Sequence, residues 1–150
     1  MDDLIRIKEL KSQGFYCSQI LVMMGLELQG KNNPDLVKAV EALAGGIGFS
    51  GNICGALTGG ACLLGLYAGK GKPGEPEDER LNLMLMDLVE WFKQSVGTKY
   101  SGIDCDLILE GSQANIPQRC PGIVQTVFQK TKDLLVEYGF DLSGNPDEDE

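Results

Sequence analysis

Residues 53–68, ICGALTGGACLLGLYA, indicate most about the architecture of this chain. This stretch is apolar on nearly every side and carries no charge, which predicts a helix buried at the centre of the protein. Its 16 residues fall short of the ~20 that a membrane-spanning helix needs, so we expect no insertion into a membrane. Gly55 and Gly59 lie four positions apart, a spacing that would let another helix approach closely.

On both sides of this stretch apolar residues recur at helical spacing, and no segment has a convincing strand pattern. Proline and glycine mark the expected ends. The pattern predicts helices over 3–11, 18–29 and 53–68, from Pro34 through Ala44, from Pro76 to Gly97, over 104–109, and from Pro121 to Gly139. We therefore expect an all-α fold, a compact single-domain bundle of about five to seven helices with a central glycine-rich apolar helix.

Much of the negative charge of the chain lies in its last ten residues. Residues 1–140 are expected to form the domain, and residues 141–150, DLSGNPDEDE, an acidic disordered tail. An acidic docking segment is the alternative interpretation of the tail.

Composition excludes several classes of function. The chain has 13 Lys and Arg against 22 Asp and Glu, a net charge of −9. Because such a surface repels phosphate backbones and anionic lipids, we expect no nucleic-acid partner. There is no histidine, which excludes histidine-dependent triads, Cys–His dyads and histidine-ligated metals. The N-terminus MDDLIRIKEL lacks an apolar signal core, so we expect a cytoplasmic protein.

Cysteines are the remaining candidates for chemistry. Their odd number and wide spacing disfavour a disulfide scaffold, and the absence of a Cys-x-x-Cys pair excludes a thioredoxin-like site and local metal knuckles. Four of the five fall near predicted helix starts, whereas Cys62 lies in the middle of residues 53–68 and is expected to pack in the core. The five are Cys17, Cys54, Cys62, Cys105 and Cys120.

Cysteines at helix starts have a chemical consequence. Pro121 is expected to open the last helix, which puts Cys120 at its N-cap. Asn52 is a suitable N-cap for the central helix, so Cys54 would lie in the first turn, and Asp104 precedes Cys105 in the same way. Unpaired amides and the helix dipole stabilise a thiolate there, so the positions predict a lowered thiol pKa.

The segment Cys54-Gly55-Ala56-Leu57-Thr58-Gly59 resembles the CGAxxG signature of the C_GCAxxG_C_C family, bacterial and archaeal redox-active proteins with four cysteines in a fixed order. The resemblance runs from about Leu10 to Tyr138 and leaves Cys62 outside the pattern. It implies redox activity carried by Cys17, Cys54, Cys105 and Cys120, with Gly55, Ala56 and Gly59 as motif residues.

Three functions stay open at this point. The first is thiol–disulfide exchange or electron transfer with a protein redox partner or electron donor and no cofactor: Cys54 attacks, Cys17 is its partner in the family order, and Cys105 and Cys120 form the second couple. The second is an iron–sulfur cluster, or less favourably zinc, held by the same four cysteines. The third is a helical adaptor whose cysteines only pack.

Two further points stay open. The glycines before Cys54 could form an anion cradle, an interpretation that the lack of a preceding strand and of nearby basic residues disfavours. The oligomeric state is not fixed by the sequence, a homodimer being one option.

Overall fold

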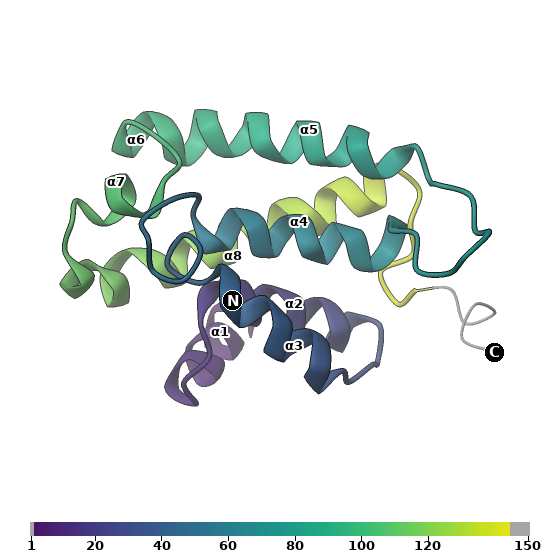
Figure 1. Cartoon of the computed structure of the whole chain (residues 1–150), viewed down its shortest axis with the longest axis horizontal. Coiled ribbons are helices and arrows are strands. Elements are labelled where there is room, and N and C mark those ends of the chain that lie inside the picture. Colours follow the sequence, from purple (N-terminus) through teal and green to yellow (C-terminus); the bar gives the residue numbers. More distant parts are fainter. Residues whose placement is uncertain (1, 145–150) are drawn as a thin grey trace.

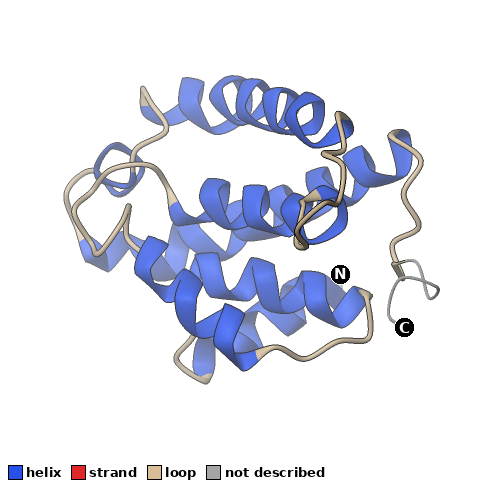
Figure 2. Ribbon diagram, turned by 45° about the vertical axis from the view of Figure 1, so that its right-hand side comes forward, coloured by secondary structure: helices blue, strands red, loops and turns tan. Residues whose placement is uncertain are grey.

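The computed structural model describes residues 2–144, and within them the chain is built from helices (Figures 1 and 2). The only β pairing there is an isolated bridge between Ile53 and Asp104. The prediction of an all-α fold is confirmed. The helices are α1 (Asp2–Ser12), α2 (Cys17–Leu28), α3 (Pro34–Val40), α4 (Gly55–Ala68), α5 (Arg80–Phe92), α6 (Thr98–Tyr100), α7 (Cys105–Leu109) and α8 (Ile116–Glu137).

Helix α4 lies at the centre, as the apolar stretch predicts. It packs against α2, α5 and α8, and Figure 1 shows it between α5 on one side and α2 and α3 on the other. Leu63 and Leu64 of α4 are fully buried, each contributing about 1.5–3 kcal/mol to folding. A β-carbon on Gly59 would lie 2.8 Å from the Cα of Ser18, so this glycine allows α2 to approach α4 closely.

The start of α5 differs from the prediction. Pro76 and Glu77 belong to a loop, and the helix begins at Arg80. The Asp78 carboxylate accepts a hydrogen bond from the Arg80 backbone N–H (3.0 Å) and pairs with its guanidinium (2.7 Å). This local turn fixes the helix start beyond the proline.

Gly97 does not end the helical run, contrary to the prediction. Helix α5 continues through a π-helical turn, Lys93–Gly97, directly into α6. Gly97 has helical backbone angles and is buried, so its cost of about 1 kcal/mol relative to alanine is tolerated. The run ends at Ser101, whose φ of 67° is left-handed.

The last helix begins earlier than predicted. Helix α8 begins at Ile116, and Pro117 lies in its first turn. Pro121 had been predicted at that place. Pro121 therefore lies inside the helix, and Cys120 is not an N-cap. The prediction was wrong because two prolines four residues apart both satisfy the signal for a helix start.

None of the helices within residues 2–144 is long and apolar enough to cross a membrane. Of the predicted acidic tail, only Asp141–Gly144 is described: the Leu142 carbonyl accepts a hydrogen bond from the Tyr67 hydroxyl (2.6 Å). Residues 145–150, which hold most of the tail's acids, lie outside the described residues.

Candidate functional site

The four cysteines that the family resemblance selects come from four different segments of the fold. Cys17 is the first residue of α2, Cys54 is the N-cap of α4, and Cys105 is the first residue of α7. Cys120 is in the early part of α8. None of the four forms a disulfide in this structure.

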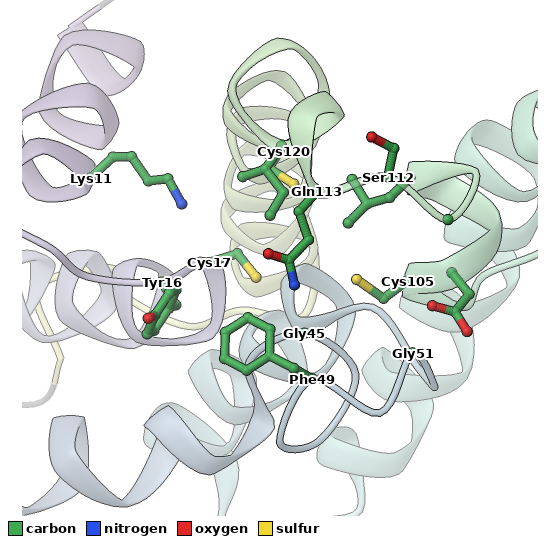
Figure 3. A pocket seen from close by; sticks show the side chains of 14 residues that line it. Lys11, Tyr16, Cys17, Gly45, Phe49, Gly51, Cys105, Ser112, Gln113 and Cys120 are labelled. Carbon is green, nitrogen blue, oxygen red and sulfur yellow. The ribbon is translucent and has the colours of Figure 1, made fainter.

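Three of the four sulfurs lie at one cavity of about 160 Å³ (Figure 3), and the fourth lies behind it. Cys17, Cys105 and Cys120 line it. Cys54 is only 7% exposed and lies next to Cys17, because a β-carbon on its neighbour Gly55 would be 2.7 Å from the Cys17 Sγ. Residues spread over more than a hundred positions therefore share one site.

Short backbone pairing brings the starts of α4 and α7 together. The Cys54 N–H donates to the Ile103 carbonyl (3.0 Å), and the Cys105 N–H donates to the Asn52 carbonyl (2.6 Å). These bonds enclose the isolated bridge between Ile53 and Asp104. Because backbone bonds do not depend on side-chain type, the sequence carries no clear signal for this pairing.

A turn of left-handed backbone forms another wall of the site. Residues 45–49, the left-handed turn, all have positive φ, including 71° at Ile47 and 60° at Phe49. Such angles cost a residue with a β-carbon about 1–2 kcal/mol, which explains the glycines at 45, 46 and 48. Phe49 lines the cavity and its ring contacts that of Tyr16 edge-on, with centroids 5.2 Å apart.

The prediction of lowered thiol pKa values was wrong. Burial raises the pKa of Cys17 and of Cys54 to about 12 and that of Cys120 to about 11. Burial, followed by the negative charge of Asp106, also raises the pKa of Cys105. The amides of Ala56 and Leu57 do lower the pKa of Cys54, but loss of solvation outweighs the helix start.

Mutual repulsion adds to the effect of burial. The four cysteines Cys17, Cys54, Cys105 and Cys120 also act on one another. In every pair of them, the negative charge of one thiolate raises the pKa of the other thiol. Repulsion of this kind is stronger inside a protein than in water, because the dielectric constant is lower there. The four groups are therefore one electrostatic unit, and at neutral pH they are thiols.

Two oppositely charged side chains line the cavity, Lys11 of α1 and Asp106 of α7. Lys11 lowers the pKa of both Cys17 and Cys120. Its Nζ lies 5.7 Å from the centre of the Tyr16 ring, and Figure 3 shows the side chain reaching toward the two sulfurs. The positions of Lys11, Tyr16 and Phe49 at the cavity were not predicted, since nothing in their spacing from the cysteines marks them.

Other residues of this region were also considered in the sequence analysis. Cys62, which was expected in the core, is half-buried and packs at the edge of a separate apolar cluster around Val22, Leu26 and Val40. Ala56 of the motif is buried. The four cysteines are the side chains that a cluster or zinc would use. Among residues 2–144 no three Cys, Asp or Glu side chains are arranged as a metal site, and the cofactor alternative stays a prediction.

Comparison with known proteins agrees with the motif. The family model described as "Putative redox-active protein (C_GCAxxG_C_C)" matches residues 15–134, a range that includes Cys17, Cys54, Cys105 and Cys120. No curated protein and no solved structure matches the chain significantly.

Proposed function

The chain belongs to the C_GCAxxG_C_C family, and on this premise we propose that it is a thiol–disulfide redox protein. Its partner is a protein that carries a disulfide. The observation that carries the proposal is that Cys17, Cys105 and Cys120 line one cavity and that Cys54 interacts with Cys17 and Cys105 behind it. A disulfide requires two cysteines that approach each other closely, a condition that thiols gathered around one cavity meet better than scattered thiols.

Access divides the four cysteines into an outer and an inner pair. The outer pair, Cys105 and Cys120, is partly exposed and lines the cavity. The inner pair is Cys54, which is 7% exposed, and Cys17, which also lines the cavity but whose pKa burial raises to about 12, further than that of Cys120. We therefore assign the exchange with the partner to the outer pair and not to Cys54, which the sequence analysis chose as the attacking thiol.

The electrons and protons of the exchange are all supplied and accepted by the cysteines and the partner disulfide. One outer thiol loses its proton and attacks a sulfur of the partner disulfide, and the second partner sulfur leaves as a thiolate. The other outer thiol then attacks the mixed disulfide, which releases the partner as a dithiol and leaves a Cys105–Cys120 disulfide. Two electrons and two protons pass to the partner. The inner dithiol can reduce this disulfide in the same way and form a Cys17–Cys54 disulfide.

Mapping the disulfides that form under mild oxidation tests the proposal. The reduced protein is treated with oxidised glutathione in a folded state, and bonds are identified by peptide mass spectrometry. We expect a Cys105–Cys120 bond first, no such bond in Cys105→Ser, and unchanged kinetics in the matched control Cys62→Ser. If oxidation with Cys105→Ser proceeds at the wild-type rate, the outer pair is not the exchanging pair.

A further inference from the structure

The charges at the cavity are distributed unevenly around the outer pair. Among the residues lining the cavity, Lys11 is the positively charged one and Asp106 the negatively charged one. Asp106 follows Cys105 in the chain, on α7. Lys11 lies on the opposite wall, on the last turn of α1, which packs against α8. The two thiols of the outer pair thus face charges of opposite sign.

The contacts of the Lys11 side chain are at this cavity. None of the ion pairs formed by the described residues involves it, and its Nζ lies over the ring of Tyr16. It also lines the small neighbouring cavity that reaches Cys17, Cys120 and Pro121. A lysine ammonium held beside two thiols stabilises whichever of them is deprotonated.

The two thiols beside Lys11 are not equivalent. For Cys120, the lowering of the pKa by Lys11 exceeds the increase caused by Cys105. For Cys17, the lowering of the pKa by Lys11 is the smallest of the named contributions. Cys17 is also confined by α4, since its Sγ is so close to Gly55. The groups facing Cys120 are thus Lys11 and the other three thiols, and Lys11 is the one that favours its charged form.

We propose that Lys11 is a positioning residue that stabilises the Cys120 thiolate, so that Cys120 resolves the mixed disulfide that Cys105 forms with the partner. This inference rests on the proposed function for its last step. When the Cys120 proton leaves, the negative charge forms next to the ammonium. The pKa of Cys105 is raised less than that of Cys120, which reaches about 11, so Cys105 loses its proton first and attacks the partner disulfide. The first bond therefore forms between Cys105 and the partner sulfur, and Cys120, beside Lys11, then attacks this mixed disulfide.

Site-resolved alkylation of the reduced, folded protein tests this inference. Iodoacetamide reacts with the thiolate, so its rate at each cysteine, followed by peptide mass spectrometry from pH 7 to pH 10, measures the thiolate fraction. We expect Lys11→Met to slow alkylation of Cys120 about three- to tenfold at fixed pH, and Lys11→Arg to restore most of the rate. Lys8→Met, on the exposed face of the same helix, is the matched control and should not change it.

A second variant tests the opposite charge, that of Asp106. Asp106→Asn removes the negative charge beside Cys105, so alkylation of Cys105 should become faster while that of Cys120 stays the same. Salt of about 1 M, which shortens the screening length to about 3 Å, should slow Cys120 in the wild type but not in Lys11→Met. Far-UV circular dichroism shows that the variants are folded, and Lys11→Gln replaces Lys11→Met if the latter is not.

Equal Cys120 rates in wild type and Lys11→Met over the whole pH range would overturn the inference. An equal loss in Lys8→Met would also overturn it, because the effect would then come from net charge. The alkylation does not require any disulfide to form. A protein whose Cys120 responds to Lys11 but which forms no disulfide under oxidant would disprove the proposed function and leave Lys11 as a determinant of thiol acidity.

Discussion

The Cys17 sulfur lies against the backbone of Gly55, at the start of the central helix. A β-carbon on Gly55 would come within 2.7 Å of the Cys17 Sγ and 3.3 Å of the Leu43 carbonyl oxygen. The second residue of the CGAxxG motif therefore has to be glycine for Cys17 to keep its place beside Cys54. The motif is thus a packing requirement between two cysteine-bearing segments as well as a sequence pattern.

Gly55→Ala should displace the Cys17 side chain from the cavity. We expect the free energy of unfolding, measured by urea denaturation, to fall by about 1–3 kcal/mol because the added carbon overpacks this contact. Alkylation of Cys17 should become faster, since its sulfur moves away from the buried position.

Gly65→Ala is the matched control on the same helix. No heavy atom lies within 4 Å of a β-carbon there, so the substitution should be neutral or stabilise α4 by up to about 1 kcal/mol through the higher helix propensity of alanine. Equal effects of the two substitutions would show that helix propensity, and not the Cys17 contact, sets the cost at Gly55.

The left-handed turn predicts a purely conformational effect at Gly48. Its φ is 58° and a β-carbon there would meet no neighbour within 4 Å. Gly48→Ala should therefore destabilise the protein by about 1–2 kcal/mol through backbone strain alone. Gly71→Ala, which also has open space but no left-handed φ, should not destabilise it. Thermal unfolding of the two variants decides the point, and a stable Gly48→Ala would mean that the turn adopts another conformation.

Much of the fold follows from local pattern. The apolar stretch at 53–68 and the spacing of Leu81, Leu85 and Leu88 suffice to predict helices, because burial of one face dominates helix formation in proteins. Boundaries were less predictable. Pro76, Gly97 and Pro121 each carry a valid start or stop signal, but the Asp78 turn, the π-helical turn and Pro117 determine the actual ends.

The site was predictable in its cysteines but not in its environment. Order and flanking residues were enough to select the four. Their pKa values were not predictable from helix position, because burial of Cys17 and Cys54 depends on how α2 packs against α4. Lys11 and Asp106 reach the cavity through tertiary packing, for which a single sequence offers no spacing rule.

The raised thiol pKa values make the stability of the reduced protein dependent on pH. Folding raises the pKa of Cys17 and of Cys54 from 9.0 to about 12, so between these values the folded state holds protons that the unfolded state has lost. The stabilisation is complete below about pH 9 and is lost as pH rises toward 12, by up to about 1.4 kcal/mol per pH unit for each thiol. Urea denaturation under reductant from pH 8 to pH 10.5 should show this decrease.

Cys54→Ser isolates the contribution of one thiol to that decrease. Serine does not ionise in this range, so the loss of stability with pH should be shallower in the variant than in the wild type. A parallel pH dependence in both proteins would mean that Cys54 is not buried as a thiol, and that other groups, such as tyrosines and lysines, cause the decrease.

Reversible disulfide formation among Cys17, Cys54, Cys105 and Cys120 can be followed through the intact mass of the folded protein. The mass is measured in the native state after mild oxidation and again after addition of dithiothreitol. We expect a loss of about 2 or 4 Da, one or two disulfides per chain, which reductant restores. A mass that stays at the value of the fully reduced chain, with all five thiols still reactive after unfolding, would contradict it.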